Sequence, residues 1–301
     1  MTPRHLLDQA AWLGLAGLLT VGLVVYLAAL TVVTHRRLRR PRRRTYAWAV
    51  ACGLPGEPSE LARPRAYSAW TFSRAGLEFG VWDIEGDDDA GPIVVATHGW
   101  GGSRIEMLGR AAALAPAASR VVLWDMPGHG ETGGVCSLGG REVDDLLALV
   151  GVVGRPVVLL GHSLGAEVCL RAAHASPELV QGLILEAPYR RGITPARRML
   201  RVAEFPVLVN LPAAMAMIGL VSGRGIRARW QDLAALAPRV PTLVLHGSAD
   251  ETCPIEDAEA IASASGGELV RLEGAGHQNL FECDVVADQV RGFLRGLGQQ
   301  G

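Results

Sequence analysis

A long uncharged stretch near the amino terminus constrains this chain most. No residue from Gln9 to His35 carries a formal charge at neutral pH, and Ala10 to Val33 is almost wholly Leu, Val, Ala and Gly. At 1.5 Å per residue, a helix of about 24 residues can cross the roughly 30 Å hydrocarbon core of a membrane. We therefore expect a transmembrane helix here.

A cleaved signal peptide is the alternative explanation for this stretch. Signal peptides have a shorter apolar segment, followed directly by a small-residue cleavage site. Here the apolar stretch is longer and ends in the segment from His35 to Arg44 (HRRLRRPRRR), a poor cleavage context. The sequence favours a retained anchor, with residues 1–44 forming the helix and its basic flank.

Charge is distributed unevenly along the chain. All 29 basic residues are arginine, and the formal net charge is −1. Residues 1–44 hold eight arginines against one acid, Asp8, a net +7 that leaves −8 for the remainder. This asymmetry indicates a membrane surface or a nucleic acid as partner of the basic end. Nucleic acid is the weaker alternative because no aromatic or base-reading pattern accompanies the arginines.

The positions of these arginines predict an orientation. Seven of them follow the apolar stretch, and only Arg4 precedes it. The positive-inside rule then places the C-terminal side in the cytoplasm. There each arginine gains on the order of 1 kcal/mol from the anionic leaflet. We expect a single-pass membrane protein whose main domain is cytoplasmic, with an anionic lipid surface as a partner.

The cysteines do not form a recognisable pattern. Their number is odd, they are widely scattered, and no C-x-x-C pair occurs among Cys52, Cys136, Cys169, Cys253 and Cys283. This argues against a disulfide framework or a zinc site and fits a reducing compartment.

Residues beyond the anchor predict an α/β domain. Residues 45–65 are rich in Pro and Gly, as in a linker, and Ala66–Phe72 with Leu77–Ile84 resembles a hairpin. Short continuous apolar runs then alternate with longer helical stretches, as in a mostly parallel sheet covered by helices on both faces. The predicted strands are Ile93–Thr97, Val121–Trp124, Val157–Leu160, Leu183–Leu185, Leu243–Leu245 and Glu268–Leu272.

A candidate nucleophile follows one of these strands. Gly161-His162-Ser163-Leu164-Gly165 comes directly after Val157–Leu160 and precedes the helix-favouring residues 166–175. A serine on a tight strand-to-helix turn needs small neighbours, because the chain passes close to itself there. The pentapeptide alone is weak in a chain with 37 glycines. The strand before it and the helix after it make the pattern specific.

Two further residues complete a catalytic set. Asp250 follows the strand Leu243–Leu245, and His277 follows the last predicted strand. A serine hydroxyl becomes a good nucleophile when an imidazole removes its proton, and a carboxylate orients that imidazole. Because catalytic groups of parallel sheets cluster at the carboxyl ends of strands, we expect Ser163, His277 and Asp250 to form a triad.

Residues from about 66 to 297 resemble the α/β-hydrolase fold superfamily. The matching segments are His98–Gly102, Asp125–Thr132, Gly161–Gly165, His246–Asp250 and Gly274–His277. The resemblance implies that the backbone N–H groups of Trp100 and Leu164 bind the oxyanion. Serine at position 163 argues against the dehalogenase and epoxide-hydrolase branches, whose nucleophile is a carboxylate.

Other polar and aromatic residues have structural interpretations. His98 and His129 lie in Gly-rich turns, where we expect them to organise loops. The resemblance assigns Asp125 to support of its loop, because it precedes Ser163 and breaks the triad order. We expect Trp70, Trp82 and Trp124 in the core.

A segment between Pro188 and Pro241 interrupts the strand pattern. The resemblance implies a cap here, at about 189–240, inserted over the active site. It carries nine arginines against Glu204 and Asp232, a net +7 that leaves −15 for linker and core, and Phe205–Gly223 is uncharged. Two interpretations stay open: the apolar face packs over the pocket only, or it also enters the membrane interface while the arginines bind lipid phosphates.

Taken together, these features predict a membrane-anchored serine hydrolase that cleaves carboxylic esters, with apolar or lipid-like acyl groups. Acyl transfer through the same triad and a non-catalytic tethered scaffold are the alternatives, and a peptidase is disfavoured. No metal or organic cofactor is implied. The sequence does not predict the substrate, its acyl length or the oligomeric state.

Overall fold

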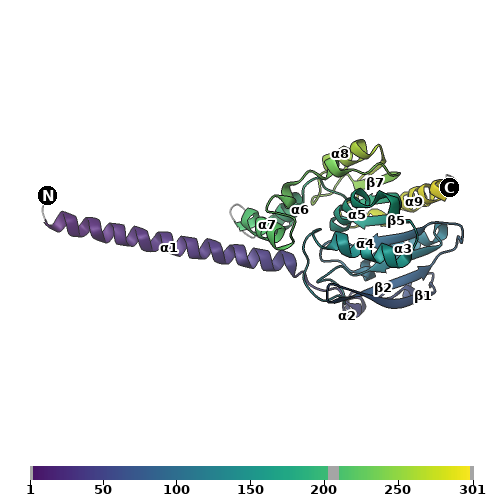
Figure 1. The fold of residues 1–301 in the computed structure, drawn as a ribbon, viewed down its shortest axis with the longest axis horizontal. Helices are drawn as coiled ribbons and strands as arrows, with labels where there is room; N and C mark the ends of the chain where they lie inside the picture. The colour runs from purple at the N-terminus through teal and green to yellow at the C-terminus, as the bar shows by residue number, and fades with distance from the viewer. Residues whose placement is uncertain (1–2, 203–209, 299–301) are drawn as a thin grey trace.

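The structure, a computed structural model, describes residues 3–202 and 210–298. One long helix, α1 (Pro3–Arg39), projects from the rest of the molecule (Figure 1). Its segment Trp12–Arg39 is long and apolar enough to cross a membrane, and the most apolar part of it is unburied. Within the described ranges, no other helix meets both conditions.

Eight strands form one mixed sheet in the order β1-β2-β4-β3-β5-β6-β7-β8. The hairpin β1–β2 and the pair β2–β4 are antiparallel, and all other pairs are parallel. Every predicted strand is present, most of them longer than expected by one to four residues. The strands are β1 (Tyr67–Arg74), β2 (Leu77–Glu85), β3 (Ile93–Thr97), β4 (Arg120–Trp124), β5 (Val157–His162), β6 (Val180–Glu186), β7 (Thr242–Gly247) and β8 (Glu268–Leu272).

Helices cover both faces of the sheet, so the predicted fold class is confirmed. On one face, α4 (Glu142–Val153), α5 (Leu164–Ala175) and α8 (Ile255–Ser265) contribute to one apolar cluster. On the other face, α3 (Leu108–Leu114) and α9 (Asp284–Gly298) contribute to a second. The central strands β3 and β5 are buried along their whole length, as their continuous apolar sequences predict.

The cap helices lie beside the end of α1 (Figure 1). They are α6 (Ile193–Val202) and α7 (Asn210–Val221). A buried hydrogen bond of 2.6 Å, from the Asn210 amide to the Thr34 hydroxyl, joins α7 to α1. At 12 residues, α7 is only about 18 Å long, too short to span a membrane alone. Residues 205–209 of the uncharged cap stretch lie outside the described residues.

The segment 45–65 packs against the main domain. It contains α2 (Tyr46–Ala51) and a 3₁₀ turn, Pro58–Glu60, and it buries the side chains of Ala49 and Leu61. These contacts attach the end of α1 to the domain over a short, folded connection. Of the three tryptophans expected in the core, Trp82 and Trp124 are buried, whereas Trp70 is half-buried on β1.

Candidate active site

Ser163 lies on a strained turn between β5 and α5. Its backbone has φ 52° and ψ −109°, a conformation that L-residues rarely adopt. The glycines on either side make this turn possible. A Cβ on Gly161 would lie 2.3 Å from the Gly165 carbonyl oxygen, and a Cβ on Gly165 would lie 2.1 Å from the Thr97 oxygen. The G-x-S-x-G spacing is therefore required by the close approach of three backbone segments.

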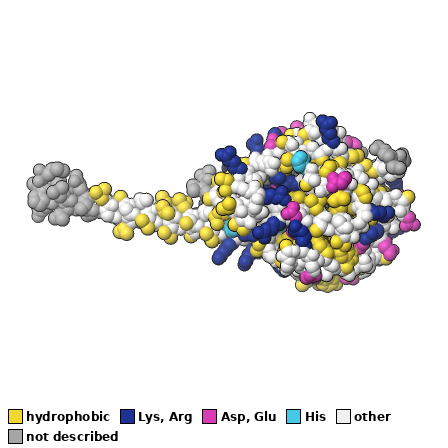
Figure 2. All heavy atoms as spheres, viewed as in Figure 1, with side chains coloured by type: hydrophobic (Ala, Val, Ile, Leu, Met, Phe, Trp, Pro, Cys, Tyr) yellow, Lys and Arg dark blue, Asp and Glu magenta, His cyan; other side chains and the backbone are white. Residues whose placement is uncertain are grey.

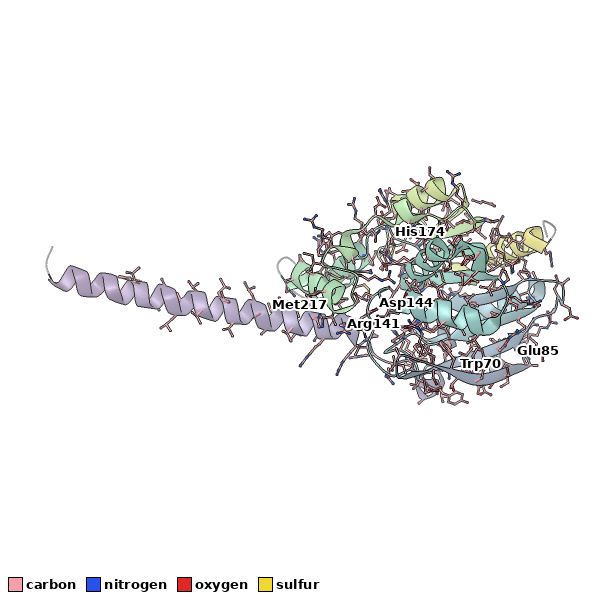
Figure 3. The ribbon with its side chains drawn as sticks, viewed as in Figure 1. Trp70, Glu85, Arg141, Asp144, His174 and Met217 are labelled. Atoms are coloured by element: carbon pink, nitrogen blue, oxygen red, sulfur yellow. The ribbon has the colours of Figure 1, made fainter. Side chains whose placement is uncertain are left out.

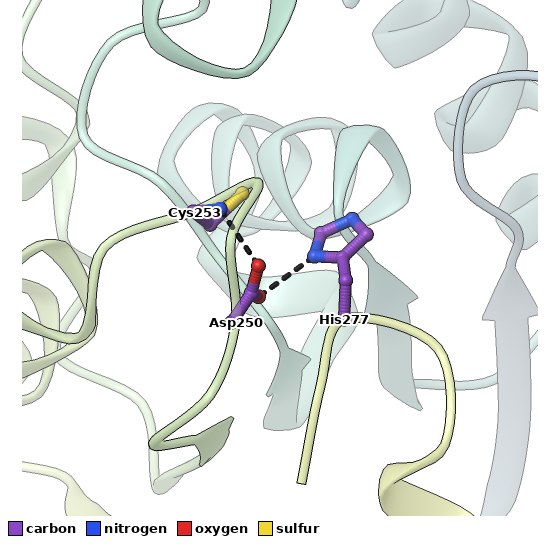
Figure 4. Close-up of side chains that lie close together, drawn as sticks. All are labelled: Asp250, Cys253 and His277. Atoms are coloured by element: carbon purple, nitrogen blue, oxygen red, sulfur yellow. Dashed lines mark hydrogen bonds and ion pairs between the residues drawn. The ribbon is translucent and has the colours of Figure 1, made fainter. Parts of the chain in front are cut away.

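The structure brings the three predicted catalytic residues together. Nε2 of His277 lies 3.0 Å from Oγ of Ser163, and Nδ1 of His277 lies 2.7 Å from Oδ2 of Asp250. All three side chains extend from loops that follow the carboxyl ends of β5, β7 and β8. Figure 4 shows the His277–Asp250 contact at the centre of the site. Serine, imidazole and carboxylate thus form one continuous hydrogen-bonded relay.

Asp250 is held as a buried carboxylate. Its side chain is fully buried, and Oδ1 accepts hydrogen bonds from the N–H groups of Thr252 (2.7 Å) and Cys253 (2.8 Å). Burial alone would raise the pKa of Asp250, but His277 and the two N–H donors hold that pKa below its usual value. Asp250 is therefore ionised at neutral pH and fixes a proton on Nδ1 of His277, which leaves Nε2 free to accept the serine proton.

His162 also contributes to the site, although the sequence motif treats its position as variable. Its Nε2 lies 2.9 Å from the His277 carbonyl oxygen, and the two rings lie 5.0 Å apart. Burial and the nearby Arg110 charge lower the pKa of His162 well below its usual value, so it is neutral and donates this bond. His162 thereby connects the nucleophile loop to the loop that carries His277.

The two expected oxyanion donors both lie beside Ser163. Leu164 begins α5, so its N–H has no acceptor within the helix. In the loops and turns that the structure describes, the N–H groups of Trp100 and Leu164 donate to no backbone carbonyl. Both N–H groups are therefore free of a loop carbonyl partner. The indole of Trp100 donates to the Leu38 carbonyl oxygen over 2.8 Å, which attaches the end of α1 to this loop.

Ser163 opens into a small apolar cavity of about 40 Å³. At 10–15 Å³ for each water, this volume holds about three water molecules. Three parts of the chain form its walls: the end of α1, the core loops and the cap. Its lining residues are Leu38, Trp100, Leu138, Ser163, Leu164, Tyr189, Gly192, Pro195, Ala196, Met199 and Arg229. We call it the Ser163 cavity.

Asp250, Cys253 and His277 also offer ligand atoms that lie within 4.8 Å of one another, as a metal site would (Figure 4). However, Asp250 already has three hydrogen-bond donors. Burial raises the pKa of the Cys253 thiol well above its usual range, which disfavours the thiolate that metals bind. The arrangement fits a hydrogen-bonded triad better than a metal site.

His98 and Asp125 hold loops together, as the sequence predicts, and Nδ1 of His129 lies 3.0 Å from the Pro127 carbonyl oxygen within its own loop. Asp125 accepts from the backbone N–H groups of Arg104 (2.7 Å) and Glu131 (3.0 Å). Nε2 of His98 accepts from the Met126 N–H over 3.0 Å, and its Nδ1 lies 2.7 Å from the Gly99 oxygen. A neutral imidazole satisfies both contacts, because Nδ1 donates and Nε2 accepts. His98 can therefore be buried without a charged partner, and it is not part of the Ser163–His277–Asp250 relay.

Because His98 and His129 are buried, we expect the stability of the fold to decrease at acidic pH. Burial lowers the pKa of His98 to about 4 and that of His129 to about 3, whereas both titrate near 6.5 when unfolded. The unfolded chain therefore takes up these protons first, and stability present above pH 6.5 is lost as the pH falls towards 4. Between pH 7 and pH 4, the titration of His98 alone should lower the free energy of unfolding by about 3 kcal/mol. Urea denaturation at a series of pH values measures this decrease.

The exposed His174 provides a matched control for this experiment. His98→Gln should flatten the pH dependence of stability, and His174→Gln should leave it unchanged. Equal profiles for the two variants would contradict the argument.

Comparison with known proteins agrees with this geometry. Residues 93–289 match the model of the Alpha/beta hydrolase family, which covers the sheet from β3 onwards and all three relay residues. The chain belongs to the alpha/beta hydrolase family.

Curated relatives of this alpha/beta hydrolase have varied names. The dihydrolipoyllysine-residue acetyltransferase component of the acetoin cleaving system of Pseudomonas putida is 29% identical over 71% of this chain and 66% of its own length. The human Protein ABHD12B is 26% identical over 65% of this chain and 61% of its own. The chain thus spans slightly less than two thirds of these relatives.

Solved structures with the same fold include the Pyrococcus furiosus esterase Pf2001, with a TM-score of 0.66, 19% identity, and coverage of 86% of this chain and 98% of that chain. A membrane phospholipase A, described as a bacterial virulence factor, gives a TM-score of 0.59 and 20% identity over 98% of this chain and 99% of its own. At these identities the likeness is one of fold.

Proposed function

We propose that this alpha/beta hydrolase is a membrane-anchored serine hydrolase that cleaves carboxylic esters of apolar acyl groups. The observation that carries the proposal is the Ser163–His277–Asp250 relay at the mouth of an apolar cavity. In our division of the chain, residues 1–44 are the anchor, 45–65 the linker, and 66–297 the hydrolase domain, with the cap at about 189–240.

The proposed reaction proceeds through an acyl-enzyme. Ser163 attacks the ester carbonyl while Nε2 of His277 takes its proton, and Asp250 stabilises the imidazolium. The N–H groups of Trp100 and Leu164 donate to the oxyanion, each contributing on the order of 3 kcal/mol. His277 then protonates the departing alcohol. Water, activated by the same imidazole, releases the acid and regenerates the serine.

A substrate series tests the proposed class. Hydrolysis by the full-length protein is measured for esters of increasing acyl length, with and without detergent micelles. We expect rates to increase when an apolar ester is presented at an interface. A strong preference for short, soluble esters that ignores micelles would exclude the lipid-like class. Acyl transfer, the second candidate, uses the same relay, and product analysis with competing alcohols and amines measures its share.

From the position of Leu38, we expect the end of α1 to influence which acyl chains the enzyme prefers. This side chain at the end of α1 is 6% exposed and lines the cavity next to Ser163. Leu38→Ala removes part of the wall and should shift the rate ratio towards longer acyl chains by about tenfold, because a few methylenes decide fit in an apolar pocket. Leu23→Ala, an exposed leucine on the same helix, is the control. Identical selectivity in the two variants would contradict a role for Leu38.

The membrane surface is the proposed partner of two basic regions. Figure 2 shows arginine side chains gathered at the end of the domain from which α1 projects. Exposed arginines occur in the anchor flank, among them Arg36 and Arg40, and in the cap, among them Arg197 and Arg227. Because α7 packs on α1 at Thr34, the cap lies next to the end of the proposed span. This proximity supports contact of the cap with anionic lipid.

The exposed thiol of Cys52 reports the orientation of the domain. If the domain is cytoplasmic, a membrane-impermeant maleimide should not label the protein in intact cells. The same reagent should label Cys52 after the cells are permeabilised. Labelling of intact cells to the same extent would reverse the proposed topology.

A further inference from the structure

A second, larger cavity lies between core and cap. Its walls come from the loop 137–140, from α4 and α5, and from residues 222–236 at the end of the cap. We call it the lateral cavity. Its volume of about 400 Å³ is within the range of small-molecule sites and is ten times that of the Ser163 cavity. Its lining does not include Ser163, His277 or Asp250.

Three arginines line the lateral cavity: Arg171 of α5, and Arg224 and Arg229 of the cap. Arg229 is 4% exposed and binds the buried carboxylate of Glu167 with both terminal nitrogens, at 2.7 and 2.6 Å. Arg171 binds that same carboxylate through Nε at 2.9 Å. Two guanidinium groups thus share one carboxylate, which leaves an excess positive charge at the inner wall.

Several donors in this cavity have no partner among the residues that the structure describes. Nη1 of Arg171 binds the Gln231 side chain, and Nη2 is free. Nη2 of Arg224 binds the Gly140 carbonyl oxygen at 2.9 Å, and Nε and Nη1 are free. Nε of Arg229 also lacks an acceptor, but it is fully buried, so Arg229 contributes charge and no accessible free donor. A ligand with several oxygens could accept hydrogen bonds from groups on both core and cap.

One carboxylate opposes this positive charge at the cavity wall. Asp144 of α4 lies 3.6 Å from Arg224 and 3.9 Å from Arg74, and its side chain is 53% exposed. His174 of α5, also exposed, has no partner among the described residues. Figure 3 labels both Asp144 and His174. A further carboxylate, that of Glu142, is buried behind the wall and accepts hydrogen bonds from Ser137, but it does not line the cavity. The charged groups that do line it are three arginines and Asp144, which favours an anion.

We propose that the lateral cavity binds the phosphate group of a small phosphate ester. A guanidinium group matches two phosphate oxygens at once, and free donors from Arg171 and Arg224, with the charge of Arg229 behind them, suit a tetrahedral anion better than a planar carboxylate. The volume leaves room for a glycerol-sized alcohol beside the phosphate. Such a group occurs in soluble phosphate esters and in phospholipid headgroups. The site is separate from the ester-cleaving relay and does not depend on the proposed hydrolase activity.

Calorimetric titration with sn-glycerol 3-phosphate tests this site. The titrated protein is full-length Ser163→Ala in an uncharged detergent, so that no turnover occurs. We expect saturable binding that Arg224→Gln weakens at least about tenfold, the equivalent of one charge-assisted hydrogen bond. Arg227→Gln is the matched control, because Arg227 is exposed nearby and does not line the cavity. It should change the affinity less than about twofold.

A gain-of-binding variant makes the test independent of unfolding. Asp144→Asn removes the opposing carboxylate and should tighten binding by about threefold, since it removes a partly screened repulsion. Absence of saturable binding in the parent, equal weakening by Arg224→Gln and Arg227→Gln, or weaker binding in Asp144→Asn would each overturn the proposal. Matching thermal midpoints for the variants show that the fold is retained.

Titration in phosphatidylcholine nanodiscs distinguishes the two sources of phosphate. This lipid has no net charge, so it does not repel the probe. If headgroups occupy the cavity, the apparent affinity for glycerol 3-phosphate falls at least about tenfold relative to detergent, by competition. An unchanged affinity assigns the cavity to soluble phosphate esters.

Discussion

Ester hydrolysis by the Ser163→Ala variant is expected to fall by at least about 10⁴-fold in kcat. Oγ of Ser163 is the atom that attacks the carbonyl in the proposed mechanism, and no other described hydroxyl or thiol lies within hydrogen-bonding distance of His277. The remaining rate would come from the oxyanion donors and from binding alone. Kinetics with a chromogenic ester measure this loss.

Non-additivity provides the internal check on that result. If Ser163 and His277 act as one unit, the double variant Ser163→Ala/His277→Ala should be no slower than either single variant. Ser68→Ala, an exposed serine on β1, should retain full activity. A Ser163→Ala protein that keeps more than a tenth of the wild-type rate would be inconsistent with the mechanism.

The Arg110→Met variant is expected to lose about 3–5 kcal/mol of unfolding free energy. Glu186 ends β6, its side chain is 0% exposed, and Arg110 of α3 binds both of its oxygens, at 2.8 and 2.6 Å. Arg110 is its one charged partner among the described residues, so the substitution leaves a buried carboxylate unpaired. The Glu186 carbonyl also accepts from the Ser163 N–H over 2.9 Å, so the nucleophile turn should loosen as well.

Chemical denaturation measures this effect, and two comparisons interpret it. Arg110→Met/Glu186→Met removes both charges and should recover most of the lost stability, because the burial penalty disappears with the pair. Arg155→Met changes an exposed arginine without partners among the described residues and should cost less than about 0.5 kcal/mol. Equal losses in Arg110→Met and Arg155→Met would refute the importance of the buried pair.

The fold and the relay could be predicted because their signals are local. A buried parallel strand such as β5 is apolar at nearly every position, and the glycines next to Ser163 are required by contacts that the turn makes with itself and with β3. The strand-end positions of Asp250 and His277 follow from the same strand pattern. A sheet of this type therefore brings the three residues to one edge, as expected.

Other parts of the site could not be predicted because they depend on packing between distant segments. Arg229 and Glu167 are 62 residues apart and meet only when the cap docks on α5. Leu38 lies in the basic flank of the predicted anchor, and nothing in the sequence places it beside Ser163. His162 occupies the variable position of the motif, and its bond to the His277 carbonyl spans 115 residues. Such contacts follow from the tertiary arrangement.

The anchor and the cap show the same division between local and distant information. Length and hydropathy alone predict that α1 can span a membrane. They do not predict that the Trp100 indole donates to Leu38, or that Thr34 binds Asn210. These two bonds make the end of the helix part of the alpha/beta hydrolase domain.

Covalent labelling tests the central claim most directly. Full-length protein is treated with a fluorophosphonate, digested, and analysed by mass spectrometry to locate the adduct. The proposed mechanism predicts one major adduct, on Oγ of Ser163, and its strong reduction in His277→Ala, which lacks the base. Absence of an adduct, or labelling mainly at another residue, would contradict the assignment of this protein as a serine hydrolase.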